Sequence, residues 1–318
     1  MQHLKWGIQT SPQHVSYGEL LQVWQRADAL GYDSAWLFDH FMPIFSDPTG
    51  PCFEGWTMLT ALGVQTRKIH VGLLVTSMVY RNPGLLANIG ATVDVVTGGR
   101  MEMGVGAGWF EQEARAYGME FLPAGERLKQ LDEGVQVIKS LWTNPVSNFQ
   151  GRYYQLTEAH CEPKPVQLPH PPIWIGGQGE KVTLRIVAQQ ADGWDMDMFP
   201  LDEYRRKLDI LAEHCYKAGR APESVRKMIH FPGLISDDEK SLKPRVEAMA
   251  RSWNTNMDNL RQRALIGTPE QAAEHLLKFV ELGVEHFVLS IAPPYDMRMI
   301  ELFIEEVAPR VRQAAGAI

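Results

Sequence analysis

An acidic residue and a histidine stand side by side where an apolar segment ends, in the stretch WLFDHF. They are Asp39 and His40. A histidine can exchange a proton near neutral pH, and a neighbouring carboxylate can fix the orientation of its ring or raise its pKa. The pair is therefore a candidate for general acid or base catalysis. The alternative, that the histidine only caps the next segment, stays open at this point.

A second candidate is the glycine-rich stretch GVGAG at residues 104–108, which follows an alternating apolar segment. A dinucleotide fingerprint needs Gly-x-Gly-x-x-Gly opening a helix directly, and this spacing does not match it. No Gly-x-x-x-x-Gly-Lys-Ser/Thr occurs either, which excludes a P-loop. Glycines at a strand end allow a flat ligand to approach the backbone closely, but tight packing explains them equally well.

A third candidate follows the apolar run IWI and combines three glycines, Gly176, Gly177 and Gly179, with a segment of helical spacing. Backbone N–H groups at the start of a helix can hold an anion without any lysine. This loop is the best phosphate site in the sequence.

Composition narrows the class of protein. The 318 residues carry a net charge of -7, and no basic stripe interleaved with aromatic residues indicates a nucleic-acid binder. The amino terminus does not resemble a secretory signal, and no apolar run approaches the ~20 residues of a membrane span. The three cysteines are far apart, and no histidine or cysteine pairs have ligand spacing, so we expect free thiols, no metal site and a cytoplasmic protein.

The order of predicted elements favours a barrel. Strands are predicted over 4–9, 32–39, 69–75, 100–106, 173–177, 191–197, 227–235 and 285–292, and helices over 17–31, 55–64, 83–96, 126–142, 180–190, 202–218, 240–264 and from the last strand to about 314. An additional helix over 267–283 has Thr268 as its cap and Pro269 in its first turn. Eight strand–helix units favour a closed parallel barrel over a doubly wound sheet.

We therefore predict a single-domain (β/α)8 TIM barrel over residues 1–318. Insertions are expected at about 107–125, 143–172 and 236–268, and the prolines of the second indicate a surface hairpin. Chemistry in such barrels lies at the carboxyl ends of the strands, where His230 and Tyr295 are further candidates for substrate contact. Small residues, polar residues and indoles at successive strand ends predict a wide, flat ligand with an anionic tail.

The ordered set of segments WLFDHF, GLLVTSMVYRNP, TGGRMEMGVGAGW, PPIWIGGQGE, ADGWD and GTPEQAAEHL resembles the bacterial luciferase-like superfamily, specifically the branch that uses the deazaflavin coenzyme F420. The resemblance runs over nearly the whole chain. It implies a (β/α)8 barrel that binds the coenzyme at the carboxyl ends of its strands, and often a homodimer.

The resemblance also implies roles for individual residues. Asp39 and His40 match the family's Asp-His pair, in which the histidine lies beside the deazaflavin ring. Leu74 and Val75 match the site of a non-proline cis peptide that backs this ring. The remaining implied coenzyme contacts are Thr76, Gly106, Gly108, Trp109 and Gln112 near the ring and Gly176, Gly177 and Gly179 around the phosphate.

One departure from this family pattern concerns Trp109. Sugar-phosphate dehydrogenases of the branch place a catalytic glutamate at this position, and neither Glu111 nor Glu113 fills it in our alignment. We therefore do not predict a sugar-phosphate dehydrogenase.

The predicted function is hydride transfer between coenzyme F420 and a small organic substrate, because a deazaflavin passes hydride and reacts poorly with oxygen. His40, oriented or charged by Asp39, is expected to handle the accompanying proton. Two alternatives remain at this point: an FMN-dependent monooxygenase that uses dioxygen, and a cofactor-binding protein without catalysis. The substrate, the direction of transfer and the oligomer size stay open.

Overall fold

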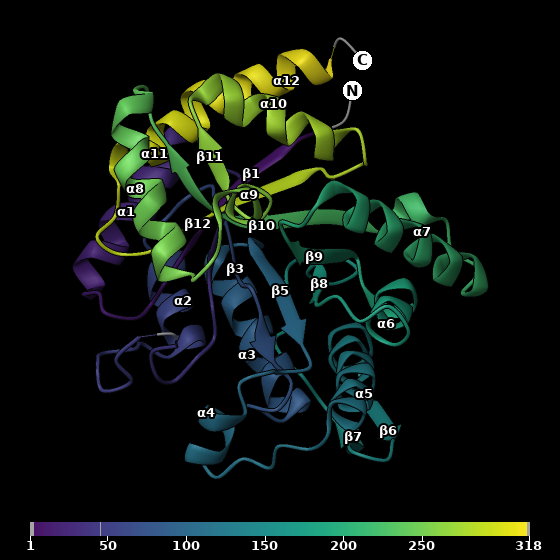
Figure 1. Ribbon diagram of the computed structural model, residues 1–318. Helices are drawn as coiled ribbons and strands as arrows, with labels where there is room; N and C mark the ends of the chain where they lie inside the picture. Colours follow the sequence, from purple (N-terminus) through teal and green to yellow (C-terminus); the bar gives the residue numbers. More distant parts are fainter. Residues whose placement is uncertain (1–2, 45, 317–318) are drawn as a thin grey trace.

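A computed structural model describes residues 3–44 and 46–316. Its centre is a ring of eight parallel strands surrounded by helices (Figure 1). Strands pair in the order β1-β2-β3-β5-β8-β9-β10-β12, and β12 pairs with β1, which closes the ring. The chain is thus a (β/α)8 TIM barrel, as the sequence predicted.

Most residues of the barrel strands are buried, as is typical of parallel strands that helices cover. The strands are β1 (Lys5–Thr10), β2 (Ser34–Leu37), β3 (His70–Leu73), β5 (Met101–Gly106), β8 (Ile173–Gly176), β9 (Gly193–Asp197), β10 (Arg226–Ile235) and β12 (His286–Ile291). Two short strands extend the ring at its rim, β4 (Thr76–Ser77) beside β5 and β11 (Leu265–Gly267) beside β10.

Helices surround the ring of strands, and several of them begin at a side-chain cap. The helices are α1 (Tyr17–Leu30), α2 (Gly55–Gly63), α3 (Pro83–Thr97), α4 (Glu111–Ala116), α5 (Ala124–Thr143), α6 (Thr183–Gln190), α7 (Leu201–Lys217), α8 (Glu239–Ser252), α9 (Met257–Arg261), α10 (Pro269–Val280), α11 (Met297–Leu302) and α12 (Ala308–Ala315). Thr268 caps α10 in a capping box with Gln271, and Pro269 is the first helical residue, which confirms both predictions.

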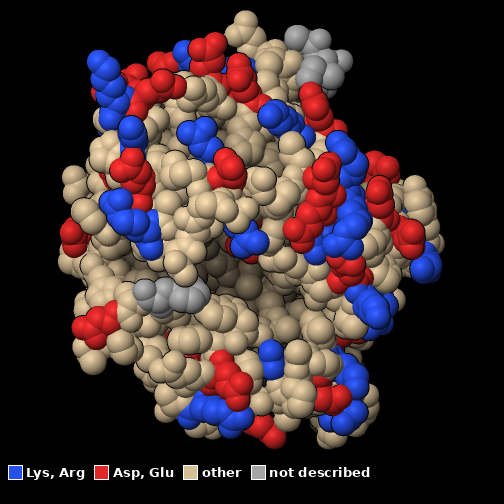
Figure 2. All heavy atoms as spheres, viewed as in Figure 1, with Lys and Arg blue, Asp and Glu red and all other residues tan. Residues whose placement is uncertain are grey.

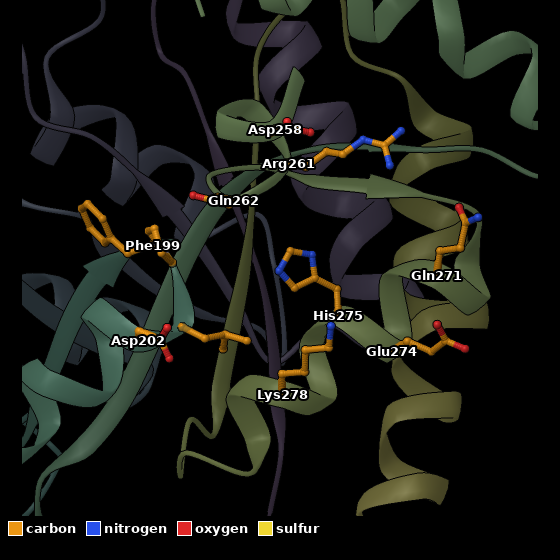
Figure 3. Close-up of a pocket in the computed structure, with 11 residues that line it drawn as sticks. Phe199, Asp202, Asp258, Arg261, Gln262, Gln271, Glu274, His275 and Lys278 are labelled. Atoms are coloured by element: carbon orange, nitrogen blue, oxygen red, sulfur yellow. The ribbon is translucent and has the colours of Figure 1, made fainter. Parts of the chain in front are cut away.

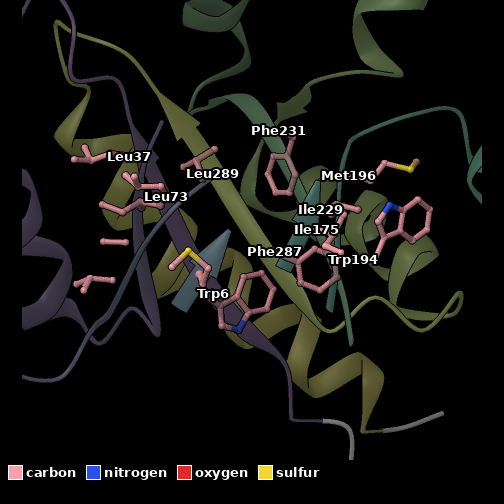
Figure 4. Close-up of a cluster of buried hydrophobic side chains, with 14 of the residues drawn as sticks. Trp6, Leu37, Leu73, Ile175, Trp194, Met196, Ile229, Phe231, Phe287 and Leu289 are labelled. Carbon is pink, nitrogen blue, oxygen red and sulfur yellow. The ribbon is translucent and has the colours of Figure 1, made fainter. Parts of the chain in front are cut away.

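Side chains of the barrel strands alternate between two hydrophobic clusters. The outward-facing residues pack against the helices in the larger cluster, which includes Leu37, Ile175, Ile229, Phe287 and Leu289 (Figure 4). Side chains on the opposite face of these strands form a separate cluster, made of Trp36, Leu74, Trp174, Met228 and Val288. Because successive side chains of a strand point to opposite faces, the second cluster fills the inside of the barrel.

The two tryptophans inside the barrel need glycine neighbours. A Cβ at Gly72 would lie 2.3 Å from Cζ3 of Trp36, and a Cβ at Gly193 would lie 2.2 Å from Cε3 of Trp174. Interior packing therefore explains these two glycines without any ligand.

Most predicted elements outside the ring are also present. The insertion at 143–172 contains the predicted hairpin, formed by β6 (Ser147–Gln150) and β7 (Gln155–Ala159). Three details differ from the predictions. The short helix α4 lies inside the insertion at 107–125, α6 begins at Thr183 rather than near 180, and the predicted helix over 240–264 is two helices, α8 and α9, separated by a turn.

The predicted strand over 69–75 is interrupted at its end. Strand β3 ends at Leu73, the Leu74–Val75 peptide bond is cis, and β4 resumes pairing at Thr76. The cis bond lies at the position that the family resemblance implied.

The structure also bears on two expectations from composition. All three cysteines are free thiols. Among the described residues, no helix combines the length and the apolar character that crossing a membrane requires.

Candidate active site

A pocket of about 320 Å³ opens where β3, β5, β8, β9 and β10 end, and we call it the strand-end pocket. One wall is apolar and the other is polar, and Figure 2 shows that this face of the molecule is hollowed near its centre. The pocket is lined by Leu74, Val75, Gly106, Ala107, Gly108, Trp109, Leu128, Gly176, Gly177, Thr183, Asp195, Asp197 and His230.

Seven of the twelve residues predicted to bind the coenzyme line this pocket. They are Leu74, Val75, Gly106, Gly108, Trp109, Gly176 and Gly177. Asp39, His40, Thr76, Gln112 and Gly179 do not line it. Gln112 is exposed on α4, and the loop at Gly179 folds back against α6, where a Cβ would lie 2.7 Å from Oγ1 of Thr183.

The glycines of this pocket make room for protein atoms. A Cβ at Gly106 would lie 2.9 Å from Cγ2 of Val75, and one at Gly176 would lie 3.0 Å from Cγ1 of Val75. A Cβ at Gly104 would lie 2.0 Å from the carbonyl oxygen of Leu73. These glycines therefore accommodate the irregular end of β3, which agrees with the packing alternative for this stretch, and Val75 lines the pocket beside Gly106 and Gly176.

His40 is held by a glutamate that the sequence analysis set aside. Its Nδ1 lies 2.8 Å from Oε2 of Glu113, which is on α4 and fully buried. Because a carboxylate can only accept, Nδ1 carries the proton and donates it. Nε2 of His40 makes no hydrogen bond among the residues that the structure describes. This atom is therefore available to gain or lose a proton.

Glu113 accepts four hydrogen bonds from two loops. Besides His40, the donors are the Tyr80 hydroxyl on Oε2 and the backbone N–H groups of Phe41 and Met42 on Oε1, at 2.6 and 3.1 Å. Burial acts to raise the pKa of Glu113, but the hydrogen bonds outweigh it and hold the pKa below its usual range. Glu113 is therefore a carboxylate that fixes the ring of His40.

Aromatic rings surround the imidazole of His40. Its ring centroid lies 5.5 Å from that of Phe38, 5.8 Å from those of Trp109 and Phe110, and 6.3 Å from that of Tyr80, all in edge-to-face arrangements. Trp109 also lines the strand-end pocket, so its indole lies beside both the histidine and the pocket.

Asp39 does not orient His40, which corrects the sequence hypothesis. Its carboxylate is fully buried. It accepts hydrogen bonds from the two terminal guanidinium nitrogens of Arg81, at 2.5 and 3.1 Å, and from the Thr76 hydroxyl. Burial raises the pKa of Asp39, although Arg81 and Thr76 partly oppose that rise. Asp39 and Thr76 thus stabilise the loop after β3 without lining the pocket.

The polar wall of the pocket contains a second histidine between two carboxylates. His230 on β10 places Nδ1 3.0 Å from Oδ1 of Asp195 and Nε2 3.0 Å from Oδ1 of Asp197, both on β9. The register of the two strands pairs His230 directly with Asp197. The sequence analysis named His230 as a candidate from its place near a strand end, but not its two partners.

Another pocket of about 780 Å³ lies between the start of α7, α9 and α10 (Figure 3). Its lining mixes Asp202, Asp258 and Glu274 with Arg261 and Lys278, and it shares no residue with the strand-end pocket. Among the described residues, no group of three or more histidine, cysteine, aspartate or glutamate side chains has a geometry that could hold a metal ion.

The family follows from comparison with known proteins. The luciferase-like monooxygenase model matches residues 3–286, and the chain belongs to this family. It is 27% identical to the F420-dependent glucose-6-phosphate dehydrogenase of Microbacterium testaceum, over 98% of each chain. It is 28% identical to the enzyme of the same name from Nocardia farcinica, over 99% of this chain and 100% of that one.

Solved structures support the fold. The F420-dependent secondary alcohol dehydrogenase in complex with an F420-acetone adduct superposes with a TM-score of 0.84 at 21% identity, covering 97% of this chain and 99% of that one. This likeness confirms the (β/α)8 fold.

Proposed function

We propose that this protein is a coenzyme F420-dependent oxidoreductase that transfers a hydride between the deazaflavin and a small organic substrate. The observation that carries the proposal is a strand-end pocket with an apolar wall, next to a histidine whose tautomer is fixed by Glu113. Support also comes from the curated relatives, which are named F420-dependent dehydrogenases and match the chain over almost its full length.

The residues of the pocket fit a flat ring system. Val75 and Trp109 offer apolar surface, and the backbone at Gly106 and Gly108 has no side chain of its own to obstruct a planar group. We propose that these residues hold the deazaflavin ring. Gly176, Gly177 and Gly179, which precede α6, are proposed to hold the phosphate of its side chain through backbone N–H groups.

The coenzyme, when bound, accepts or donates a hydride, and the protein positions the substrate and manages the proton. We assign a proton-exchanging role to His40. Its Nδ1–H is committed to Glu113, so Nε2 is the atom that gains or loses the proton. The surrounding aromatic rings limit the access of water to this imidazole.

The substrate is proposed not to be a sugar phosphate. The relatives named glucose-6-phosphate dehydrogenases are 27 and 28% identical to this chain. At the position where the branch has its catalytic glutamate, this chain has Trp109, whose indole is 55% exposed and carries no carboxylate. An exposed indole beside the pocket favours a less polar organic substrate.

The alternative is an FMN-dependent monooxygenase, which the description of the family favours. Such an enzyme would consume dioxygen when reduced FMN and substrate are supplied, whereas a deazaflavin enzyme would not. The same barrel can serve both cofactors, so the cofactor must be tested directly.

Small molecules are the proposed partners, with no nucleic acid or membrane involved. We further propose a cytoplasmic homodimer. Three free cysteines agree with a reducing compartment. The dimer rests on the family resemblance, and sedimentation equilibrium tests it, since a monomeric mass at micromolar concentration would exclude a stable dimer.

The function is tested by anaerobic turnover. The purified protein is mixed with oxidised F420 and a panel of alcohols, or with reduced F420 and a panel of aldehydes, ketones, imines and enones, and the absorbance of the oxidised coenzyme is followed. Turnover of at least one compound without dioxygen is expected. Turnover only with reduced FMN and dioxygen would replace the proposal by the monooxygenase.

A further inference from the structure

Interconversion of an alcohol and its carbonyl compound transfers two hydrogens. One moves as a hydride at the carbon atom, and the other moves as a proton at the oxygen atom. His40 does not line the strand-end pocket, whereas His230 does, together with Asp195 and Asp197. We propose that His230 is the residue that exchanges a proton with the substrate's oxygen. This inference rests on the proposed function and assigns the substrate's proton to His230, so that His40 would exchange a proton beside the coenzyme rather than with the substrate.

The geometry favours a His230 ring that carries both protons. Each of its nitrogens lies 3.0 Å from a carboxylate oxygen, and a neutral ring would turn a lone pair toward one of the two carboxylates. Burial acts to lower the pKa of His230, but Asp195 and Asp197 outweigh it and raise the pKa well above its usual value. A charged imidazole at neutral pH is a proton donor ready for use.

The two carboxylates differ in exposure, and this difference suggests their separate tasks. The side chain of Asp195 is 4% exposed, whereas that of Asp197 is 59% exposed. Asp195 can therefore hold Nδ1–H throughout, as Glu113 holds His40. Asp197 is the partner that a substrate oxygen can replace at Nε2.

Asp197 and His230 also line a neighbouring pocket of about 450 Å³, which joins the strand-end pocket through these two residues. Its other walls include Met198, Phe199 and Trp253. A substrate seated in this second pocket would reach His230 from the side opposite to Val75. A substrate that extends from this second pocket into the strand-end pocket would pass His230, so that its carbonyl carbon could contact the coenzyme while its oxygen faces Nε2.

The step balances in the direction of reduction. A hydride supplied by the reduced coenzyme would add to the carbonyl carbon as its C–H bond breaks, the π electron pair of the C=O bond moves to oxygen, and that oxygen takes the proton from Nε2 of His230. One N–H bond breaks, one O–H bond forms, and the neutral imidazole regains a proton from water by way of the exposed Asp197. In the oxidation of an alcohol, each change runs in reverse.

Other charged and titratable groups around His230 set its pH response. Gln178 donates to Asp197 at 3.1 Å, Arg263 faces the same carboxylate across the neighbouring pocket, and Tyr204 lies behind Asp195. Of these groups only Arg263 carries a charge at neutral pH. Its charge opposes protonation of His230, whereas Asp195 and Asp197 favour it.

The first experiment reads the charge of His230 directly. Imidazole 15N NMR spectra of the full-length protein, with His230→Gln for assignment, are recorded from pH 6 to 9 with and without F420. Both ring nitrogens are expected to be protonated at pH 7.5. A neutral His230 ring at pH 7.5 would overturn the proposal, whatever the activity of the enzyme.

The second experiment separates catalysis from folding. His230→Gln is compared with His160→Gln, a matched change at an exposed histidine of the hairpin, on the carbonyl compound that the wild type reduces fastest. For His230→Gln we expect kcat to fall about 100-fold or more, F420 affinity to stay within threefold, and the alkaline fall in kcat/KM to disappear. His160→Gln should match the wild type, and a kcat of His230→Gln within threefold of the wild type would contradict the proposal.

Asp197→Asn provides a variant that keeps the histidine. Loss of one carboxylate charge should shift the alkaline fall in kcat/KM to lower pH, and an unshifted profile would count against the proposal. Failure of the proposed function is distinguishable from failure of the His230 proposal. If the proposed function is wrong, the wild type itself binds no F420 and reduces no carbonyl compound. In that case the NMR measurement still decides the charge of His230.

Discussion

Nδ1 of His40 lies 2.8 Å from Oε2 of Glu113, although the two residues are 73 positions apart in the chain. The contact joins the loop after β2 to the short helix α4, and Tyr80 from the loop before α3 donates to the same carboxylate. Three loops at the carboxyl ends of neighbouring strands thus meet at the buried carboxylate of Glu113. Its hydrogen bond fixes the orientation of the His40 ring for proton exchange.

Replacement of His40 tests its role in catalysis. His40→Ala is expected to lower kcat by roughly 10² to 10⁴, the usual contribution of a general acid or base. F420 affinity, measured by fluorescence quenching, reports separately whether the ring also supports the coenzyme. Near-normal turnover together with near-normal F420 affinity would remove His40 from the mechanism.

Replacement of Glu113 tests the contact itself. Glu113→Gln replaces one accepting oxygen by an amide N–H₂ group, which cannot accept the hydrogen bonds that its neighbours donate. We therefore expect the free energy of unfolding to fall by about 1–3 kcal/mol. The kcat should fall as well, because the ring of His40 is no longer fixed. Urea unfolding and steady-state kinetics measure the two effects.

The matched control is Glu111→Gln on the same helix, since Glu111 is exposed and its one ion pair among the described residues is with Arg115. This change should alter the unfolding free energy by no more than about 0.5 kcal/mol. Equal effects of the two substitutions would show that Glu113 has no special role.

The glycine at position 106 is predicted to serve packing against Val75. Gly106→Ala places a Cβ 2.9 Å from Cγ2 of Val75 and should destabilise the fold by about 1–3 kcal/mol. Adding Val75→Ala removes the clash, so the double variant should recover about 0.5–3 kcal/mol relative to the sum of the two single effects. Additive effects in this double-mutant cycle would indicate that the two side chains do not compete for space.

A buried histidine inside the barrel predicts an acid-sensitive fold. His286 is fully buried, its Nε2 lies 2.7 Å from Oγ of Ser34, and burial lowers its pKa to about 3. The unfolded chain binds a proton at this residue below its ordinary pKa of about 6.5, so acidification favours unfolding in the window between these two values.

The expected slope is a loss of about 1.4 kcal/mol per pH unit between pH 6 and pH 5, before the carboxylates titrate. His286→Gln removes this titration and should flatten the slope by about that amount, as read from urea unfolding at several pH values. Parallel slopes for the wild type and the variant would mean that His286 is not held neutral in the fold.

Much of the fold could be predicted from local sequence. Alternating strand and helix patterns, the Thr268 cap and the proline-rich hairpin all reflect chemistry within a few residues, and all are present in the structure. The split of the predicted helix at 240–264 was missed, because its polar residues have helical spacing on both sides of the turn.

The site was only partly predictable. Asp39 and His40 are adjacent in the loop after β2, yet their side chains bind different partners, Arg81 and Glu113, which adjacency in sequence does not reveal. Glu113 stands on a six-residue helix inside a predicted insertion, and its only local signal is a carboxylate on the buried face of that helix. Contacts between distant loops, such as those of Glu113, have no periodicity that a sequence pattern can reveal.

The central claim is that the strand-end pocket binds a deazaflavin. The most direct measurement is a paired titration of the purified apoprotein with F420 and with FMN, followed by fluorescence quenching or calorimetry. The account predicts that F420 binds at least a hundredfold more tightly than FMN, a difference of about 2.7 kcal/mol. Tighter binding of FMN would contradict it, and failure to bind either cofactor would mean that the pocket serves neither.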